Sequence, residues 1–255
     1  MEKKPFIIFN LMDLSIIIPV FNEEQKIRRD IAAASRFLSD NNKQGEIIVV
    51  DDGSTDQTSE VVSNTAEHKG VILRLITCKE HTGKGKAVKT GILEAGADLI
   101  MFIDSGNCVP YENLIRGIDR LHAGECDIAH GSRFLKDSLI TRPRKNYRKL
   151  VSYLFRKYIR VFGRIPRHLT DTQCGLKIYG KDIAHELYAE CITDGFLFDV
   201  EIILRAGEKG YRIREFPIEW TSDPDSRLSV RRTLPSMFAE LRSIRRALRS
   251  SGQDG

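Results

Sequence analysis

Short apolar runs alternate with helix-like segments through the first half of the chain, and this alternation constrains the fold more than any other feature. The runs are too short for ordinary helices and carry few polar side chains, which is typical of strands buried on both faces. They cover residues 14–20, 46–51, 71–77 and 98–104. The segments with helical spacing are residues 23–38, 56–68, 84–95 and 110–122. The pattern predicts the α/β class, with a central, mostly parallel sheet and helices on both faces.

The second half is less regular but has no linker. Helices are predicted over residues 146–162, 181–189, 200–209 and 234–249, and residues 211–220 alternate like one strand. We therefore expect an N-terminal tail over residues 1–13 and one domain over residues 14–232. Residues 233–255 should form a basic amphipathic helix and a disordered tail.

Polar side chains follow three of the four predicted strands. Because the carboxyl ends of parallel strands meet at one edge of a sheet, these side chains predict a ligand site at that edge. They are Asn22 and Glu23 after the first strand, Asp51 and Asp52 after the second, and Asp104 and Ser105 after the fourth.

No stretch reaches the ~18–20 uncharged apolar residues that cross a bilayer. The best candidate, residues 5–20, is interrupted by Asp13 and lacks the cleavage site of a signal peptide. The five cysteines form no Cys-x-x-Cys pair, which argues against structural zinc and a disulfide framework. We expect a cytoplasmic protein, or one bound only to the surface of a membrane.

A basic segment over residues 133–167 holds twelve lysines and arginines and one acid, Asp137. Such a run is often only a solvated surface. It also suits an anionic membrane surface, a phosphorylated ligand or nucleic acid. No nucleic-acid motif or aromatic platform accompanies it, so nucleic acid is not expected. Arg148 and Ser152, four residues apart, share one face of the predicted helix.

Seven motifs carry a family resemblance. They occupy residues 15–24, 49–56, 83–86, 102–105, 131–133, 171–175 and 198–201, in an order spread over most of the chain. In this order they resemble the family 2 glycosyltransferases, which implies a single GT-A-type Rossmann-like domain. Asp171-Thr-Gln-Cys-Gly175 together with Phe198-Asp-Val-Glu201 resembles the polyprenyl- (dolichyl-) phosphate hexose synthases, glucosyl more than mannosyl.

The resemblance implies roles for particular residues. Catalytic roles fall on Asp104, Asp199 and Arg227, and the acceptor phosphate would be held by Arg133, Arg148 and Ser152. The nucleotide sugar would be bound by Pro19, Asn22, Glu23, Asp52, Lys84, Asp104 and Ser105.

Elementary chemistry supports these roles but also offers simpler interpretations. Carboxylates can hydrogen-bond ribose hydroxyls, the turn at Lys84 attracts anions, and the planar fork of arginine fits phosphate oxygens. Alternatively, Asp52 belongs to an ordinary strand-to-helix turn with Asp56 as N-cap, and Asp199 complements a helix dipole.

The metal motif is incomplete. Asp104 occupies the first position of the family's Asp-x-Asp motif, but the second and third ligand positions are Gly106 and Cys108. Three interpretations stay open: Asp104 binds Mg²⁺ or Mn²⁺ with waters and diphosphate alone, basic residues replace the metal, or catalysis has been lost.

The sequence therefore predicts an inverting hexosyltransferase that uses UDP-glucose, or else GDP-mannose, and a polyprenyl or dolichyl phosphate acceptor. We expect it on the cytoplasmic face of a membrane, held by the helices over residues 146–162 and 234–249, with a separate membrane protein as a further candidate partner. The alternatives are a carbohydrate acceptor, with Asp194 or Asp199 as an essential base, and a non-catalytic protein that binds sugar nucleotides or membrane surfaces.

Overall fold

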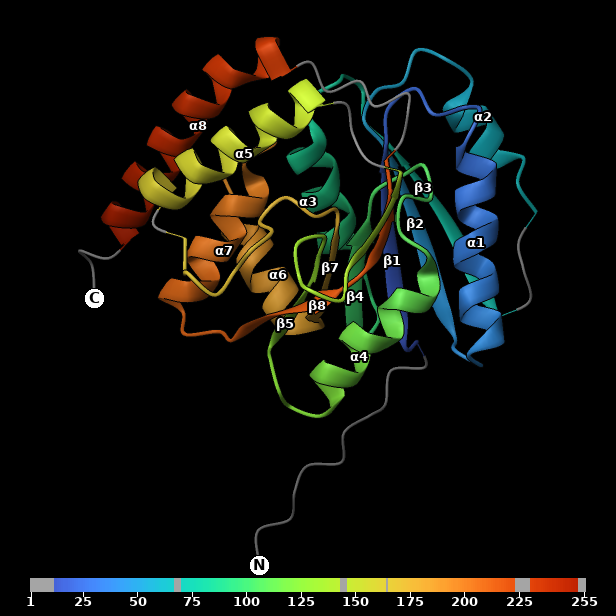
Figure 1. The fold of residues 1–255 in the computed structure, drawn as a ribbon. Helices are drawn as coiled ribbons and strands as arrows, with labels where there is room; N and C mark the ends of the chain where they lie inside the picture. The colour runs from blue at the N-terminus through green and yellow to red at the C-terminus, as the bar shows by residue number, and fades with distance from the viewer. Residues whose placement is uncertain (1–11, 67–69, 143–145, 164, 223–229, 252–255) are drawn as a thin grey trace, which may run out of the picture.

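A seven-stranded sheet forms the centre of the computed structural model, which describes residues 12–66, 70–142, 146–163, 165–222 and 230–251 (Figure 1). The strand order is β3-β2-β1-β4-β7-β5-β8. Only β7 runs antiparallel to its neighbours, β4 and β5. The strands are β1 (Leu14–Val20), β2 (Gly45–Asp51), β3 (Val71–Thr77), β4 (Leu99–Ile103), β5 (Ile128–Ser132), β7 (Leu176–Gly180) and β8 (Ile213–Pro217). The predicted mostly parallel sheet is confirmed.

Helices cover both faces of this sheet. One face packs against α1 (Ile27–Asp40), α2 (Thr58–Ser63) and α4 (Leu114–His122), which follows a 3-10 turn at Tyr111–Asn113. The other packs against α3 (Lys84–Glu94), α6 (Lys181–Glu190) and α7 (Phe198–Glu208). Alternate residues of β1 enter the two cores, Ile17 on one side and Ile16 and Ile18 on the other, as the period of a strand requires.

Two predicted elements differ in the structure. Residues 211–220 do not form one strand: β8 ends at Pro217, and β9 (Glu219–Thr221) pairs instead with β6 (Leu139–Arg142) in a separate sheet. Proline has no N–H to donate, so pairing in the main sheet stops there. The helix expected to reach residue 68 ends at Ser63, where the N–H groups of Asn64 and Thr65 bond back to Glu60 and Val62.

The last helix packs on the domain. Helix α8 (Val230–Ser251) lies beside α5 (Asn146–Gly163), and both cover α7 (Figure 1). Buried side chains of α8 join the core shared with α3 and α7, namely Met237, Leu241, Ile244 and Leu248. Among the described helices, none is long and apolar enough to cross a bilayer.

Helical spacing places Leu150, Leu154, Tyr158 and Phe162 on one apolar stripe of α5, and the described part of this stripe does not pack as a unit. Tyr158 packs partly buried against the core, and the neighbouring Ile159 is buried, but Leu154 and Phe162 are 54% and 51% exposed. The face of α5 turned toward the core therefore differs in part from the one that helical spacing suggests.

Candidate active site at the carboxyl edge of the sheet

Asp104 stands directly after β4, at the edge where the polar strand ends meet. Its N–H donates to the carbonyl of Gly175 at 2.9 Å, and Lys84 Nζ lies 2.5 Å from its Oδ1. The carboxyl group lies against the Cα of Gly175, so closely that no Cβ fits there. The side chain is 41% exposed and so remains open to a ligand.

Positive charge surrounds this carboxylate. Burial alone would raise the pKa of Asp104, but the charges of Lys84, Lys177 and Arg133 outweigh it and hold the pKa below its ordinary value. Burial alone would lower the pKa of Lys84, but the carboxylates of Asp104 and Asp199 outweigh it and raise the pKa of the ammonium group. Both partners therefore stay charged near neutral pH.

A buried carboxylate, Asp52, holds the loop that leads to Lys84. Its oxygens accept hydrogen bonds from the backbone N–H groups of Thr82 at 3.0 Å and Gly83 at 2.9 Å. His81 Nδ1 lies 2.7 Å from the same group. This carboxylate is 4% exposed, so the geometry gives Asp52 a loop-holding role whether or not it also meets a nucleotide.

The end of β1 is organised in the same way. Pro19 is buried within β1 and lies beyond the last residue pair between β1 and β4. The N–H that proline lacks is therefore not needed for a hydrogen bond between these two strands. Asn22 adopts a φ of 55° and accepts from the N–H groups of Thr55 at 2.7 Å and Asp56 at 3.3 Å. Glu23 donates its N–H to Thr58 at 2.8 Å and pairs with Lys26 at 3.6 Å. The strand end is thus tied to the start of α2.

A fully buried ion pair lies beneath Asp104. Lys177, on β7, is 0% exposed and donates to Asp199 at 2.5 Å and to the carbonyl of Cys174 at 2.8 Å. Burial raises the pKa of Asp199 despite the neighbouring charges of Lys177 and Lys84. A buried charge of this kind is costly without its partner, so the pair holds the first turn of α7 against β7.

Arg133 follows β5 and forms a second buried pair. Its Nε and Nη2 donate to the two oxygens of Asp171 at 2.7 and 2.8 Å, a bidentate geometry. Burial would raise the pKa of Asp171, but Arg133 outweighs it and lowers that pKa. Glu215, on β8, accepts from the N–H groups of Thr170 and Asp171 at 2.8 and 2.6 Å and so fixes the loop that carries Asp171.

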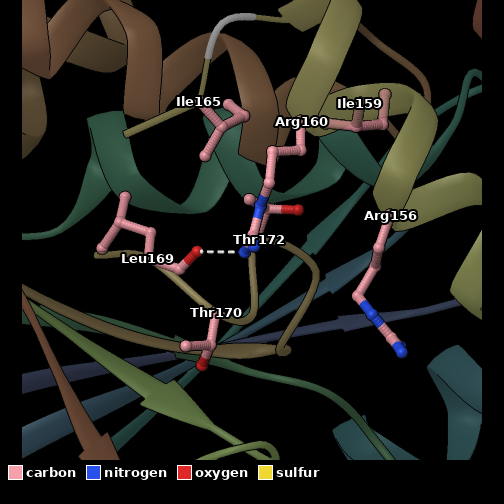
Figure 2. A pocket seen from close by; sticks show the side chains of 7 residues that line it. All are labelled: Arg156, Ile159, Arg160, Ile165, Leu169, Thr170 and Thr172. Atoms are coloured by element: carbon pink, nitrogen blue, oxygen red, sulfur yellow. Dashed lines mark hydrogen bonds between the residues drawn. The ribbon is translucent and has the colours of Figure 1, made fainter. Parts of the chain in front are cut away.

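Helix α5 lies over this pair, and a hollow separates the helix from the loop. The lining residues are Arg156, Ile159, Arg160, Ile165, Leu169, Thr170 and Thr172 (Figure 2). Arg160 closes one end by donating to the carbonyl of Leu169 at 2.8 Å. Of the other predicted acceptor residues, Arg148 and Ser152 belong to α5, but their side chains lie outside the described part of the structure, as does Arg227.

The described side chains after β4 do not form a metal site with several protein ligands. No three acidic, histidine or cysteine side chains converge as metal ligands in the described ranges. Gly106, in place of the second aspartate, has a φ of 92°, which glycine adopts without strain. Its N–H donates to the buried Asp30 at 2.6 Å, and its carbonyl accepts from Arg29 at 3.2 Å. The loop after Asp104 is therefore shaped for backbone contacts with α1, while Ser105 lies partly buried beside it.

The structure brings together Lys84, Asp104, Arg133 and Asp199, and it adds Lys177, which the sequence argument missed. A lysine between Leu176 and Ile178 in an apolar strand was the available signal. Asp30 was also missed, because a single acid on an amphipathic helix gives no sign that its side chain is buried.

Comparisons with known proteins bear on the family and the fold of the chain. A family model described as glycosyl transferase family 2 matches residues 15–188. A dolichyl-phosphate beta-glucosyltransferase of Dictyostelium discoideum is 30% identical over 84% of the chain and 68% of its own length. The enzyme of that name from Homo sapiens is 30% identical over 84% of the chain and 69% of its length.

A solved structure shares the fold. Glucosyl-3-phosphoglycerate synthase from Mycobacterium tuberculosis, in complex with Mn²⁺ and UDP-glucose, has a TM-score of 0.66 at 17% identity. The match covers 94% of this chain and 78% of that one.

Proposed function

This chain belongs to glycosyl transferase family 2, has a GT-A-type fold and is a glycosyltransferase, and we propose that it moves a hexose from a sugar nucleotide to the phosphate of a polyprenyl lipid. Glucose from UDP-glucose is the favoured donor and mannose from GDP-mannose the second. The names of its relatives, dolichyl-phosphate beta-glucosyltransferases, support glucose as the sugar and a polyprenyl-type phosphate as the acceptor.

One observation carries the proposal: two subsites that each contain basic side chains lie next to each other at the carboxyl edge of the sheet. The pair of Lys84 and Asp104 lies 2.5 Å apart and partly open to solvent, with Lys177 beneath it. Arg133 lies in the second subsite, under α5, and its charge reaches Asp104. A donor that carries a diphosphate and an acceptor that carries a phosphate need two adjoining subsites that each contain basic side chains.

The reaction is a single displacement at the anomeric carbon. An oxygen of the acceptor phosphate forms the new bond as the bond to the nucleotide diphosphate breaks, so the configuration inverts. The second pKa of a phosphate monoester is near ~6, so the acceptor is largely dianionic at neutral pH and needs no strong general base. The chain's task is to position the two reactants and stabilise charge on the departing diphosphate.

Lysine and arginine side chains are our candidates for that stabilisation. Lys84 is already beside Asp104, and the family resemblance adds Arg227. We propose that Asp104 orients Lys84 and contacts the donor, and that Asp199 acts through Lys177 rather than as a base, since its carboxylate is 3% exposed and ion-paired.

A divalent cation would have one carboxylate ligand here, Asp104, and that carboxylate is already paired with the ammonium group of Lys84. The residues present therefore do not fit a metal site built from several protein ligands, although the related synthase binds Mn²⁺.

We propose that the outer surface of α5 and α8 rests on the cytoplasmic face of a membrane. Five large apolar side chains there are at least half exposed, namely Tyr153, Leu154, Val161, Phe162 and Phe238. The ring of Tyr158 joins the two helices, with centroids 4.8 Å from Phe162 and 4.6 Å from Phe238. Exposed basic residues such as Lys157, Arg242 and Arg249 flank them, as in interfacial helices.

The test is a transfer assay with labelled UDP-glucose and, separately, GDP-mannose, using a short-chain polyprenyl phosphate. Extraction should recover lipid-linked label, more from UDP-glucose. Label transferred only to a carbohydrate would favour the alternative acceptor, in which the exposed Asp194 is a candidate base. Nucleotide binding without any transfer would favour a non-catalytic protein.

A further inference from the structure

Arg133 is not by itself a strong site for a dianion. Both its Nε and its Nη2 are engaged by Asp171, and the two side chains are 11% and 1% exposed. The pair is close to neutral as a unit, so it offers an incoming phosphate little net charge. A phosphate arriving beside Arg133 needs a second cation that no carboxylate already neutralises.

Arg156 is such a cation. Its guanidinium lies over the ring of Phe134, 4.0 Å from the centroid, and Arg133 approaches the same ring at 5.7 Å. Both guanidinium groups therefore lie within 6 Å of the same ring centroid. Within the described residues, no carboxylate forms an ion pair or hydrogen bond with Arg156.

The surroundings of Arg156 favour binding an anion. Burial lowers the pKa of this guanidinium; the charge of Asp171 opposes that effect, and the positive charges of Arg133 and Arg160 add to it. The ring of Phe134 covers one face of the guanidinium and leaves its edge N–H groups able to donate. A bound phosphate would supply the missing negative charge.

A small hollow lies beside Arg156. Figure 2 shows Arg156 and Arg160 both extending from α5: Arg160 reaches Leu169 and Thr172, and the guanidinium of Arg156 points away from Thr170 and Thr172. These two threonines flank Asp171, the partner of Arg133, in the chain. Ile159, Ile165 and Leu169 line the apolar part of the hollow.

We propose that Arg156 grips a phosphate monoester dianion at the mouth of this hollow, next to Arg133, and so provides the main uncompensated charge for the acceptor. The inference rests on the proposed function for the identity of the acceptor. The shared chemistry is a phosphate monoester, whether carried by a lipid or by a soluble compound.

The experiment compares wild type with the variants Arg156→Ala and Arg156→Lys. Arg36→Ala serves as the matched control, because Arg36 is an exposed arginine on α1, away from the hollow. Equilibrium binding is measured for farnesyl phosphate, farnesol and phosphoglyceric acid, and transfer kinetics are measured with UDP-glucose as donor.

We expect Arg156→Ala to weaken farnesyl phosphate binding and raise its KM by about tenfold or more, the usual scale for losing a charged hydrogen bond. The KM for UDP-glucose and the kcat should change by no more than about twofold. Arg156→Lys should fall between, because lysine keeps the charge but not the fork. Arg36→Ala and wild type should match, and farnesol should bind weakly to all four.

Each other outcome has a fixed meaning. An unchanged KM for farnesyl phosphate in Arg156→Ala, or a loss in UDP-glucose affinity instead, overturns the inference while the proposed function stands. Failure of wild type to bind either phosphate overturns it as well. Arg156-dependent phosphate binding without sugar transfer keeps the inference and refutes the proposed function. Tighter binding of phosphoglyceric acid than of farnesyl phosphate keeps the site and assigns it a soluble acceptor.

Discussion

Replacing Gly175 by alanine tests whether the position of Asp104 controls the reaction. The Cβ of an alanine here would lie closer than 3.0 Å to three atoms of the Asp104 carboxyl group. The carboxylate must then move by about 1 Å, because the backbone on each side is held by the hydrogen bond from Asp104 to Gly175 at 2.9 Å. A displacement of that size can cost about a hundredfold in rate.

The displaced carboxylate also loses its contact with Lys84, now 2.5 Å away. Because Asp104 is partly exposed, its side chain can swing toward solvent, so we expect the loss in folding stability to stay at the low end of the about 1–3 kcal/mol typical of overpacking. That corresponds to a fall in melting temperature of a few degrees. The variant should therefore fold normally and turn over slowly.

Gly180→Ala is the matched control. Gly180 ends β7, the strand that begins directly after Gly175. Its φ and ψ of -67° and 147° suit any residue, and no atom lies within 4 Å of an added Cβ. Its stability should change by no more than about 1 kcal/mol, since a poorer helix cap and a stiffer unfolded chain act in opposite directions. Steady-state kcat and thermal melting are measured for both variants. Turnover of Gly175→Ala within about twofold of the control would refute the reasoning.

Three further predictions follow from the site. Asp104→Asn should lower kcat by about a hundredfold with little change in melting temperature, and near-normal turnover would exclude a catalytic role for this carboxylate. Activity should survive excess EDTA because lysines supply the charge, whereas complete loss restored by Mn²⁺ would show that a metal is required. Burial raises the pKa of Asp30 from 3.8 to about 6, so the folded state retains the proton longer and wild-type stability should fall by about 2 kcal/mol as pH rises from 4 to 6. The side chain of Asp30→Asn can still accept the hydrogen bond from the Gly106 N–H, so the stability of this variant should not fall between pH 4 and 6. The variant should melt at a higher temperature than wild type at pH 7.5, and a lower melting temperature at that pH would contradict this.

The first half of the fold could be predicted because short apolar runs mark its strands directly in the sequence. Strands β1 and β3 have the bounds that the apolar runs predicted, and α3 begins at Lys84 as expected. The second half could not, because β7 inserts between β4 and β5, and such a long-range pairing leaves no local pattern. The division of residues 211–220 at Pro217 had a visible signal, the proline itself.

The site was predictable where residues follow strands, as with Asp104. Its electrostatics were not, because the partners come from distant segments: Asp171 is 38 residues from Arg133, and Asp199 is 22 from Lys177. The orientation of α5 was also hidden, since its apolar side chains lie on more than one face. Helical spacing alone could not show that Leu154 is exposed and that Arg156 lies over Phe134.

The most direct measurement of the central claim is the structure of the product formed from UDP-glucose and a short-chain polyprenyl phosphate. NMR of the extracted lipid should show glucose joined through its anomeric carbon to the phosphate as a diester, in the β configuration that inversion of the α-linked donor requires. An α-linked product, sugar attached to any group other than phosphate, or no lipid-linked sugar from an enzyme that binds both substrates would contradict the account.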